Sequence, residues 1–555
     1  MKYIFLKSVA AGLLLFGLAS CADELNIHSI DPKSSPTYDV KALLAKQYAT
    51  LGLTGQQGPA GNGDLQGQDE GESGFYRTIF NLQEMCSDEV AWAWQTDTDV
   101  PNITNIAWTS SSTRCNWAYQ RLAYDITLYN QFISEQSASL DEDVIAEVRF
   151  LRALNYYYFL DLFHKAPFKE TYNTELPTQL EGKALYDWLD KELTDIEGKL
   201  KPIGAYNNSA NFGRADKGAA LALHAQLALN SVVYTDGQTN DYRKCKEYCD
   251  EIINSGAYAL STTAKNGYSG YEQVFMGDND ENEQAMKEII FPIRQDGKNT
   301  REYSGSTMLV SSMRIAGMPY SGTSNYWSCY FSRKNLVEKF FPNGDIPMAA
   351  SDATAAKDAD DAIAKDAAAG ISTRDVIAKA GDDRALFYMG TGGGIRTLSP
   401  GRQITGFLNG ASIVKWQNLR SDNSNPHDGS YSDTDIPLLR LGAIYLTRAE
   451  AEWRLGQNDA ALADIQTLQR RANRSVLSTS ADEQTIIDEW ARECYTEGRR
   501  RSDLVRFGYF TGSRYLWDFK GGQAGGTGVD SHYNVYPIPA TDLASNPNMT
   551  QNKGY

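Results

Sequence analysis

The sequence has 555 residues, 42% of them hydrophobic, and carries a formal net charge of −17. The hydrophobic fraction is sufficient for a sizeable core, whereas the acidic balance argues against nucleic acid as a partner, because phosphate binding needs clustered Lys and Arg. The same charge disfavours anionic lipid headgroups and is compatible with a neutral ligand such as a sugar.

The N-terminus has the pattern of an export signal. Its apolar stretch, 9–18, is too short for a bilayer core about 30 Å thick, so we expect a cleaved signal peptide over residues 1–20. The motif LASC, which ends at Cys21, resembles the lipobox of bacterial lipoproteins. We therefore expect palmitate-type acylation of Cys21, which anchors a protein to a membrane, and a lipidated tether over 21–36. A plain signal peptide with an incidental cysteine is the less favoured alternative.

Helical periodicity recurs along the chain, mostly in pairs. A helix is predicted over 40–51, before a glycine-rich loop. The strongest signal runs from Val144 to Leu162, where apolar residues recur every three or four positions. A pair of helices, 217–233 and 241–254, is joined by the turn-like segment YTDGQTN.

Another helix pair suggests the architecture. The segment LLRLGAIYLTRAEAEWRLG is followed by a short turn at 457–459 and then by AALADIQTLQRRAN, an arrangement that resembles a tetratricopeptide unit. A further amphipathic helix is predicted over 483–497. We therefore expect a mainly α fold in which tetratricopeptide-like helix pairs form a scaffold.

The region from Tyr258 to Ser432 differs in composition and is rich in Gly, Ser, Thr and Tyr. It contains short β-prone pieces such as EIIFPI and ASIVKW. The charged, alanine-rich stretch 352–370 is expected to be an exposed helical insertion. This region should therefore be rich in loops.

No catalytic constellation stands out in the sequence. The five histidines lack an H-E-x-x-H or comparable spacing, and there is no G-x-S-x-G elbow. The 70 acidic residues could supply a carboxylate pair, but no positive signal supports one. Cys245 and Cys249 could form a disulfide or remain two buried thiols. We expect a binding protein and not an enzyme.

Two tryptophans, Trp92 and Trp94, flank one alanine in the acidic segment DEVAWAWQTDTDVP. Residues two apart on a strand point to the same side, about 6.5 Å from each other, so the indoles would lie side by side as displayed faces. An indole can stack on the apolar face of glucose while the hydroxyls bond to polar neighbours. Burial in a core is the alternative, because Trp is mostly buried.

A second aromatic region places Tyr303 and Trp327 among Gly, Ser and Thr, in NTREYSGSTMLV and GMPYSGTSNYWSCYF. These small residues favour polar loops. Aromatic rings on loops offer contact area for carbohydrate or peptide at little entropic cost. The two regions together favour a ligand surface built from loops.

The chain resembles a known family along its whole length. Its landmarks occur in the order typical of the SusD/RagB family of outer-membrane lipoproteins. They are VRFLRALNYYYFLDLFHKAPF, the pair Asp383-Arg384, DIPLLRLGAIYLTRAEAEWRLG, DEWARECYTEGRRRSDLVRFG and YPIPATDLASNPNMTQNKGY. The segments GQDEGESGFYRT, WAWQ, PIRQDG, AGMP and YLWDFKGG are similar to starch-binding members of that family.

The resemblance implies about four tetratricopeptide-like units under a loop-rich ligand face. It also implies noncatalytic capture of starch and maltooligosaccharides at the cell surface by a protein that is lipid-anchored in the outer membrane. The glycan would pass to a SusC-like TonB-dependent transporter. Within one body, 37–555, the scaffold would take 37–255 and 433–510, and the glycan-binding part 52–110 and 256–432.

The implied sugar-binding positions are an aromatic arc and a set of polar residues: Trp92, Trp94, Tyr303 and Trp327, with Asp69, Arg77 and Asp97. The resemblance leads us to expect asparagine where Asp97 stands. A carboxylate accepts hydrogen bonds from sugar hydroxyls but cannot donate as an amide does. Affinity or orientation at this position should therefore differ.

A structural calcium site is also implied, at Asp280, Asp433 and Asp435. Oxygen-rich clusters suit calcium, but acidic loops are usually only solvated, and the sequence leaves both readings open. Two functional alternatives also stay open: a member of the same family that binds a different glycan, and a tetratricopeptide-type scaffold for protein partners.

Overall fold

The computed structural model describes residues 39–55, 58, 63–69, 71–208, 210–348, 371–394, 396–398 and 401–555. The predicted signal peptide, the lipidation site Cys21, the tether and the predicted helical insertion 352–370 lie outside these residues. The chain divides into two units, 1–45 and 46–555. Helix α2 (Val40–Gly52) begins in the described part of the first unit.

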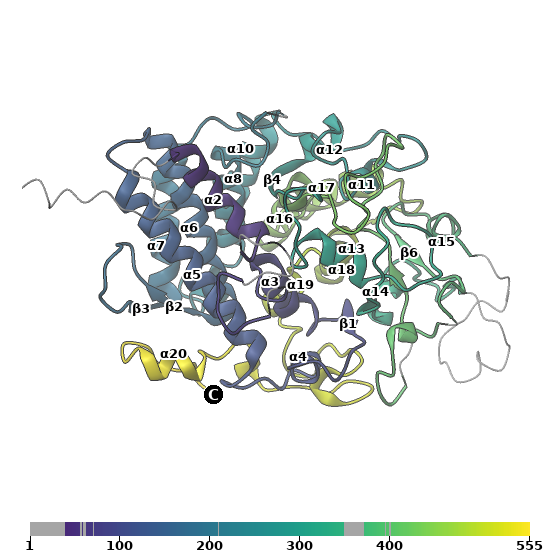
Figure 1. Ribbon diagram of the computed structural model, residues 1–555. Helices are drawn as coiled ribbons and strands as arrows, with labels where there is room; N and C mark the ends of the chain where they lie inside the picture. Colours follow the sequence, from purple (N-terminus) through teal and green to yellow (C-terminus); the bar gives the residue numbers. More distant parts are fainter. Residues whose placement is uncertain are drawn as a thin grey trace, which may run out of the picture. The chain divides into compact units, whose positions relative to one another are not determined.

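The second unit is mainly helical in its described part (Figure 1). Its α-helices are α3 (Phe75–Glu84), α4 (Val100–Thr104), α5 (Thr113–Gln136), α6 (Glu142–Phe163), α7 (Gly182–Glu197), α8 (Lys217–Leu229), α9 (Ser231–Tyr234), α10 (Tyr242–Asn254), α11 (Gly270–Gln273), α12 (Glu283–Glu288), α13 (Ser306–Ser312), α14 (Lys334–Glu338), α15 (Thr373–Ala380), α16 (Leu441–Arg454), α17 (Asn458–Arg471), α18 (Glu483–Cys494), α19 (Arg500–Arg506) and α20 (Ala540–Ser545). The prediction of a mainly α fold is confirmed.

The described strands are short and form antiparallel pairs. They are β1 (Val90–Trp92) with β5 (Tyr330–Ser332), β2 (Lys165–Phe168) with β3 (Thr178–Glu181), β4 (Ile289–Ile293) with β8 (Ile436–Arg440), and β6 (Phe387–Tyr388) with β7 (Ser412–Ile413). The β-prone EIIFPI segment forms β4, whereas ASIVKW supplies only the two residues of β7.

The scaffold is a series of helices that pack on one another in turn. Helix α5 packs on α6, α6 on α7, α7 on α8, α8 on α10, α10 on α16 and α16 on α17. Helices α5, α6, α7 and α8 lie together on the left of Figure 1. This succession is consistent with the predicted tetratricopeptide-like pairing. None of the described helices is long and apolar enough to cross a bilayer.

Two predicted helix boundaries are wrong, and local contacts explain both. The helix expected over 217–233 breaks at Asn230, whose side-chain amide donates to the Gln226 carbonyl at 2.9 Å, so that α8 and α9 are separate. The helix expected over 483–497 ends at Cys494, because Tyr495 is extended, with ψ 142°. Its hydroxyl donates to the Arg384 carbonyl at 2.8 Å.

The six described cysteines are all buried and unpaired. Cys245 and Cys249 therefore remain thiols on one face of α10, and the disulfide alternative is wrong. Burial raises the pKa of the Cys245 thiol, and the neighbouring Cys249 raises it further. These residues act as core side chains.

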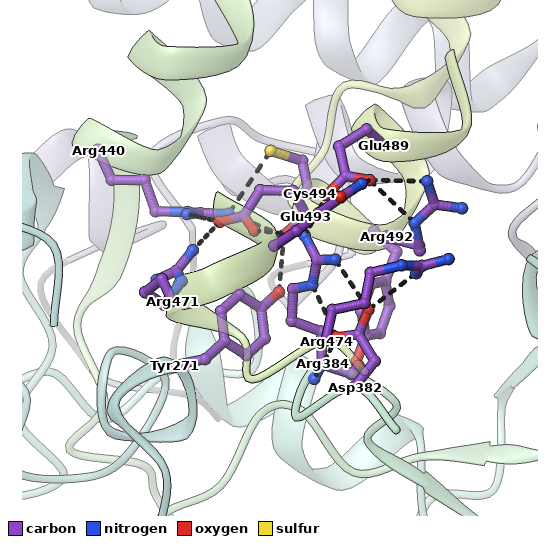
Figure 2. Close-up of polar contacts among 12 residues, drawn as sticks. Tyr271, Asp382, Arg384, Arg440, Arg471, Arg474, Glu489, Arg492, Glu493 and Cys494 are labelled. Atoms are coloured by element: carbon purple, nitrogen blue, oxygen red, sulfur yellow. Dashed lines mark hydrogen bonds and ion pairs between the residues drawn. The ribbon is translucent and has the colours of Figure 1, made fainter. Parts of the chain in front are cut away.

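A buried ionic network joins the loop-rich part to the scaffold (Figure 2). Arg384, from the loop before β6, lies 2.7 Å from Glu489 and 3.0 Å from Glu493 on α18. Arg440, at the end of β8, lies 2.7 Å from Glu493 and 3.2 Å from Glu288. The side chains of these five residues are at most 1% exposed.

Candidate functional site

The pairing of β1 with β5 brings together the two aromatic regions of the sequence. Trp92 lies opposite Tyr330 in the register of this pair. The Ala93 amide then donates to the Cys329 carbonyl at 2.7 Å. Segments more than 200 residues apart in sequence thus meet at one surface.

Trp92 and Trp94 do not lie side by side as displayed faces, and that prediction is wrong. Trp92 is 1% exposed and packs at 4.6 Å, ring centroid to ring centroid, against Tyr330. Trp94 is 42% exposed, and its ring is tilted by 72° to that of Trp92. The reason is that β1 ends at Trp92, where Gln95 closes a turn by donating to the Trp92 carbonyl at 2.6 Å. Trp92 is therefore a buried residue that packs against the exposed ring of Trp94.

Tyr303 and Trp327 form the second aromatic pair. Both side chains are half-buried, and their ring centroids are 5.6 Å apart at 76°. The Trp327 amide donates to the Ser311 carbonyl of α13 at 2.9 Å, which fixes the loop before β5. As predicted from the sequence, both rings lie on loops that leave part of each ring open.

Arg77, on α3, links the two aromatic pairs. Its guanidinium carbon lies 5.8 Å from the Trp92 ring centroid and 6.0 Å from that of Trp327, within the range of a cation–π contact. It also donates to the Tyr303 carbonyl at 2.9 Å and to the Glu72 carboxylate at 3.1 Å. Arg77 is only 7% exposed, so its main observed role is to hold the rings in place.

Glu72 and Arg114 complete this support and were not identified from the sequence. The Glu72 carboxylate lies 2.7 Å from the Arg114 guanidinium, which in turn lies 5.0 Å from the Trp92 ring centroid. No sequence spacing connects these residues, because they come from a loop, a helix and a strand. Only the fold brings them together.

The two predicted acidic residues lie at the edge of the same cluster. Asp97 is half-buried, and burial, together with the charge of Glu72, raises its pKa against the opposing charges of Arg114 and Arg77. Asp69 is exposed and accepts from the Glu72 amide at 3.0 Å. The structure therefore gathers all seven predicted sugar-binding positions into one area.

Gly71 makes this close approach possible. A Cβ at this position would lie 2.9 Å from the Tyr303 Cβ and 3.4 Å from the Arg77 Nη1. The loop that carries Asp69 could not approach Tyr303 as closely with a larger residue there. A glycine in this loop is thus a requirement of the aromatic cluster.

The predicted calcium ligands divide into two neighbouring groups. Asp280 and Asp435 both contact Arg294, with Asp280 2.8 Å from its Nη2 and Asp435 3.1 Å from its Nε. Asp433 instead approaches Asp296 and His427, and the ligand atoms of these three lie within 4.8 Å of one another. Within the described part of the chain, this is the group of three metal-ligating residue types whose ligand atoms are close enough together to hold an ion.

The donor set around Asp435 is compatible with a hard cation. Burial raises the pKa of Asp435, although the charge of Arg294 opposes this. Within the described residues, the Oε1 of Gln295 is buried without a hydrogen bond, and the buried Oδ2 of Asp435 has the ion pair with Arg294 Nε at 3.1 Å as its polar contact. Oxygen atoms of this kind are the ligands that calcium prefers, so the residues fit such an ion.

The rings of the aromatic cluster are partly open to solvent, because Trp94 is 42% exposed and Tyr303 and Trp327 are half-buried. A cavity of about 440 Å³ lies between α6, α9, α19 and the C-terminal segment, and none of the seven predicted positions lines it. An open surface suits a long chain that contacts several rings in succession.

Comparisons with known proteins identify the family of the chain. A family model described as "SusD family" matches residues 287–555. The starch-binding protein SusD of Bacteroides thetaiotaomicron is 51% identical over 563 residues, which cover 100% of this chain and 99% of that protein. The SusD-like protein P25 of Formosa agariphila is 24% identical over 452 residues, with 77% of this chain and 75% of that protein covered.

Solved structures share the fold at low sequence identity. A SusD-like protein from Bacteroides fragilis matches with a TM-score of 0.64 and 18% identity, over 93% of this chain and 96% of that chain. Surface glycan-binding protein A of Bacteroides thetaiotaomicron, solved in complex with laminarihexaose, matches with a TM-score of 0.62 and 14% identity, over 92% and 98%.

Proposed function

This chain belongs to the SusD family, and we propose on that premise that it binds starch and maltooligosaccharides without breaking them down. The full-length relative with 51% identity is named as a starch-binding protein. The described aromatic cluster supports the same assignment, because its rings can stack on glucose while Asp69 and Asp97 accept hydrogen bonds from hydroxyls.

The tilt between neighbouring rings is the observation that carries the proposal. The rings of Trp327 and Tyr303, both partly open, are tilted by 76° to one another. Rings that change direction along the surface suit a ligand that curves, as helical α-1,4-glucan does. We therefore expect cyclic or helical glucans to bind more tightly than straight, cellulose-type chains.

The ligand assignment can be tested by calorimetric titration of the purified protein with maltoheptaose, α-cyclodextrin, laminarihexaose and cellohexaose. Binding of the first two, with little or none of the others, would support the proposal. Equal binding of maltoheptaose and cellohexaose would remove the curvature argument. Preference for laminarihexaose would replace starch by a different glycan.

We also assign no catalysis to the site. Prolonged incubation of the protein with starch should release no reducing ends beyond those in a protein-free control. A rise proportional to protein concentration would contradict this assignment and would identify a glycosidase.

The proposed setting is the outer face of the outer membrane, with delivery of glycan to a TonB-dependent transporter. The lipobox-like motif at Cys21 and membership of the family support it. Cys21→Ala should release the protein from the membrane fraction and abolish palmitate labelling. If the variant remains membrane-bound, the anchor lies elsewhere.

A structural calcium ion is proposed at the acidic loops described above. Asp280 and Asp435 would hold it, with Asp433 two residues before Asp435 on the same loop, and its chemistry would be limited to bracing these loops. Calcium should raise the thermal unfolding temperature of chelator-treated protein, whereas Asp435→Asn should lose this response. An unchanged unfolding temperature in the unaltered protein would contradict the site.

A further inference from the structure

The aromatic surface does not end at Tyr303. We propose, on the basis of the proposed function, that it continues onto Tyr431 and the Arg301–Asp428 pair, which form an additional subsite for longer α-glucans. None of these three residues was predicted from the sequence.

The ring of Tyr431 continues the run formed by Trp327 and Tyr303. Its centroid lies 5.7 Å from that of Tyr303, and the two rings are 30° from parallel. Their hydroxyl oxygens are 3.3 Å apart. Trp327 meets Tyr303 edge to face, with the ring centroids 5.6 Å apart and the planes at 76°. Three rings thus follow one another at nearly equal spacing.

Polar groups border this third ring as sugar recognition requires. The Arg301 guanidinium carbon lies 5.8 Å from the Tyr431 ring centroid, and its Nη2 lies 3.3 Å from Asp428 Oδ2. The Arg301 side chain is 52% exposed. An exposed ion pair adds little to stability, but it offers N–H donors and carboxylate acceptors to sugar hydroxyls.

The loop that carries Tyr431 is fixed to the loop that carries Trp327. Asp428 Oδ1 accepts from the Tyr431 amide at 3.1 Å. From the other loop, the Ser324 amide donates to the Gly429 carbonyl at 2.7 Å, and the Asn325 side-chain amide donates to the Ser430 carbonyl, also at 2.7 Å. A ring held in this way loses little conformational freedom when a sugar binds.

A purely structural role for Tyr431, as a prop for Tyr303, makes a different prediction. Loss of a prop would weaken every ligand that contacts Tyr303, whatever its length. Loss of a subsite would weaken only ligands long enough to reach Tyr431. Chain length therefore separates the two roles.

The test is a calorimetric length series, from maltotriose to maltoheptaose, on the unaltered protein, Tyr431→Ala, Tyr431→Phe and Arg301→Ala. We expect Tyr431→Ala to weaken maltoheptaose binding about five- to tenfold, the size of one lost ring contact, and to leave maltotriose within twofold. Tyr431→Phe keeps the ring and should bind both as the unaltered protein does. Arg301→Ala should weaken only the longer ligands.

An equal loss for short and long ligands in Tyr431→Ala, or no loss for maltoheptaose, would overturn the subsite while the proposed starch binding stands. Failure of the unaltered protein to bind any of the series would overturn the proposed function and the subsite with it. Near-ultraviolet circular dichroism of each variant identifies any effect that comes from misfolding.

Discussion

Two of the described regions that contain arginine–carboxylate pairs use them for different purposes. In the buried network of Figure 2, Arg384 and Arg440 meet Glu489 and Glu493 with side chains at most 1% exposed. At the aromatic surface, Arg77, paired with Glu72, contacts the buried ring of Trp92 and the partly open ring of Trp327. The comparison teaches that a dense cluster of charges does not by itself indicate a ligand site. The indication comes from the exposed aromatic rings, which lie near Arg77 and not near the buried network.

The carboxylates of the buried network stay ionised because each is paired with arginine. Burial alone would raise the pKa of Glu489, but the charges of Arg384 and Arg492 lower it to about 2. Burial likewise opposes ionisation of Glu493, yet Arg471, Arg440 and Arg384 hold its pKa well below the usual range. Each charge therefore depends on its partners, and removal of one leaves the others uncompensated.

Breaking the network should give the largest effect. Arg440→Ala is expected to lower the free energy of unfolding by about 3–5 kcal/mol, because it leaves buried carboxylates without a counter-charge. Denaturant unfolding measures this. Arg470→Ala, an exposed change on α17, is the control and should stay within about 0.5 kcal/mol. Equal effects would show that the network contributes no more than a surface charge.

Low pH should destabilise the same buried network without any mutation. A carboxyl whose pKa is lowered in the folded state stabilises the protein above its ordinary pKa of about 4.3, and this contribution is lost as the pH falls towards 2. The unfolding temperature should fall over this window, and less steeply in Glu489→Gln than in the unaltered protein. Identical slopes would contradict the role given to Glu489.

The adjacent tryptophans sharpen the comparison within one short segment. Trp92→Ala should cost about 3–5 kcal/mol of stability, because it leaves a cavity in a packed region. Trp94→Ala should instead leave the unfolding temperature nearly unchanged and weaken maltoheptaose binding about tenfold. Tyr172→Ala, which removes another ring of similar exposure, should alter neither property. The reverse result, with Trp94 needed for stability, would contradict the assignment of roles.

The smallest effect is expected at the edge of the surface. Asp97→Asn removes a carboxylate near Glu72 and supplies an amide that can both donate and accept. We expect maltoheptaose to bind about two- to fivefold more tightly, without a change in unfolding temperature. Titration under identical salt conditions measures this, and weaker binding would show that the carboxylate itself is preferred.

The comparison also shows which features can be read from the sequence. The apolar repeat from Val144 to Leu162 predicts α6 because it depends on neighbours three and four positions away. The aromatic positions Trp94, Tyr303 and Trp327 are found through their residue type and the family resemblance. Local patterns therefore give the scaffold and part of the ligand surface.

Features that depend on distant segments could not be found in this way. Trp92 is buried because β1 pairs with β5, and no local pattern announces that pairing. Glu72, Arg114 and Tyr431 join the surface only through contacts between separate loops and helices. The end of α18 depends on the hydrogen bond from Tyr495 to a carbonyl 111 positions away.

The most direct test of the central claim is calorimetric titration of maltoheptaose into the unaltered protein and into the Trp94→Ala/Trp327→Ala double variant. The account predicts binding by the unaltered protein and none by the double variant, with the same unfolding temperature for both. Undiminished binding by the double variant would contradict it, because the glucan site would then lie away from these exposed rings.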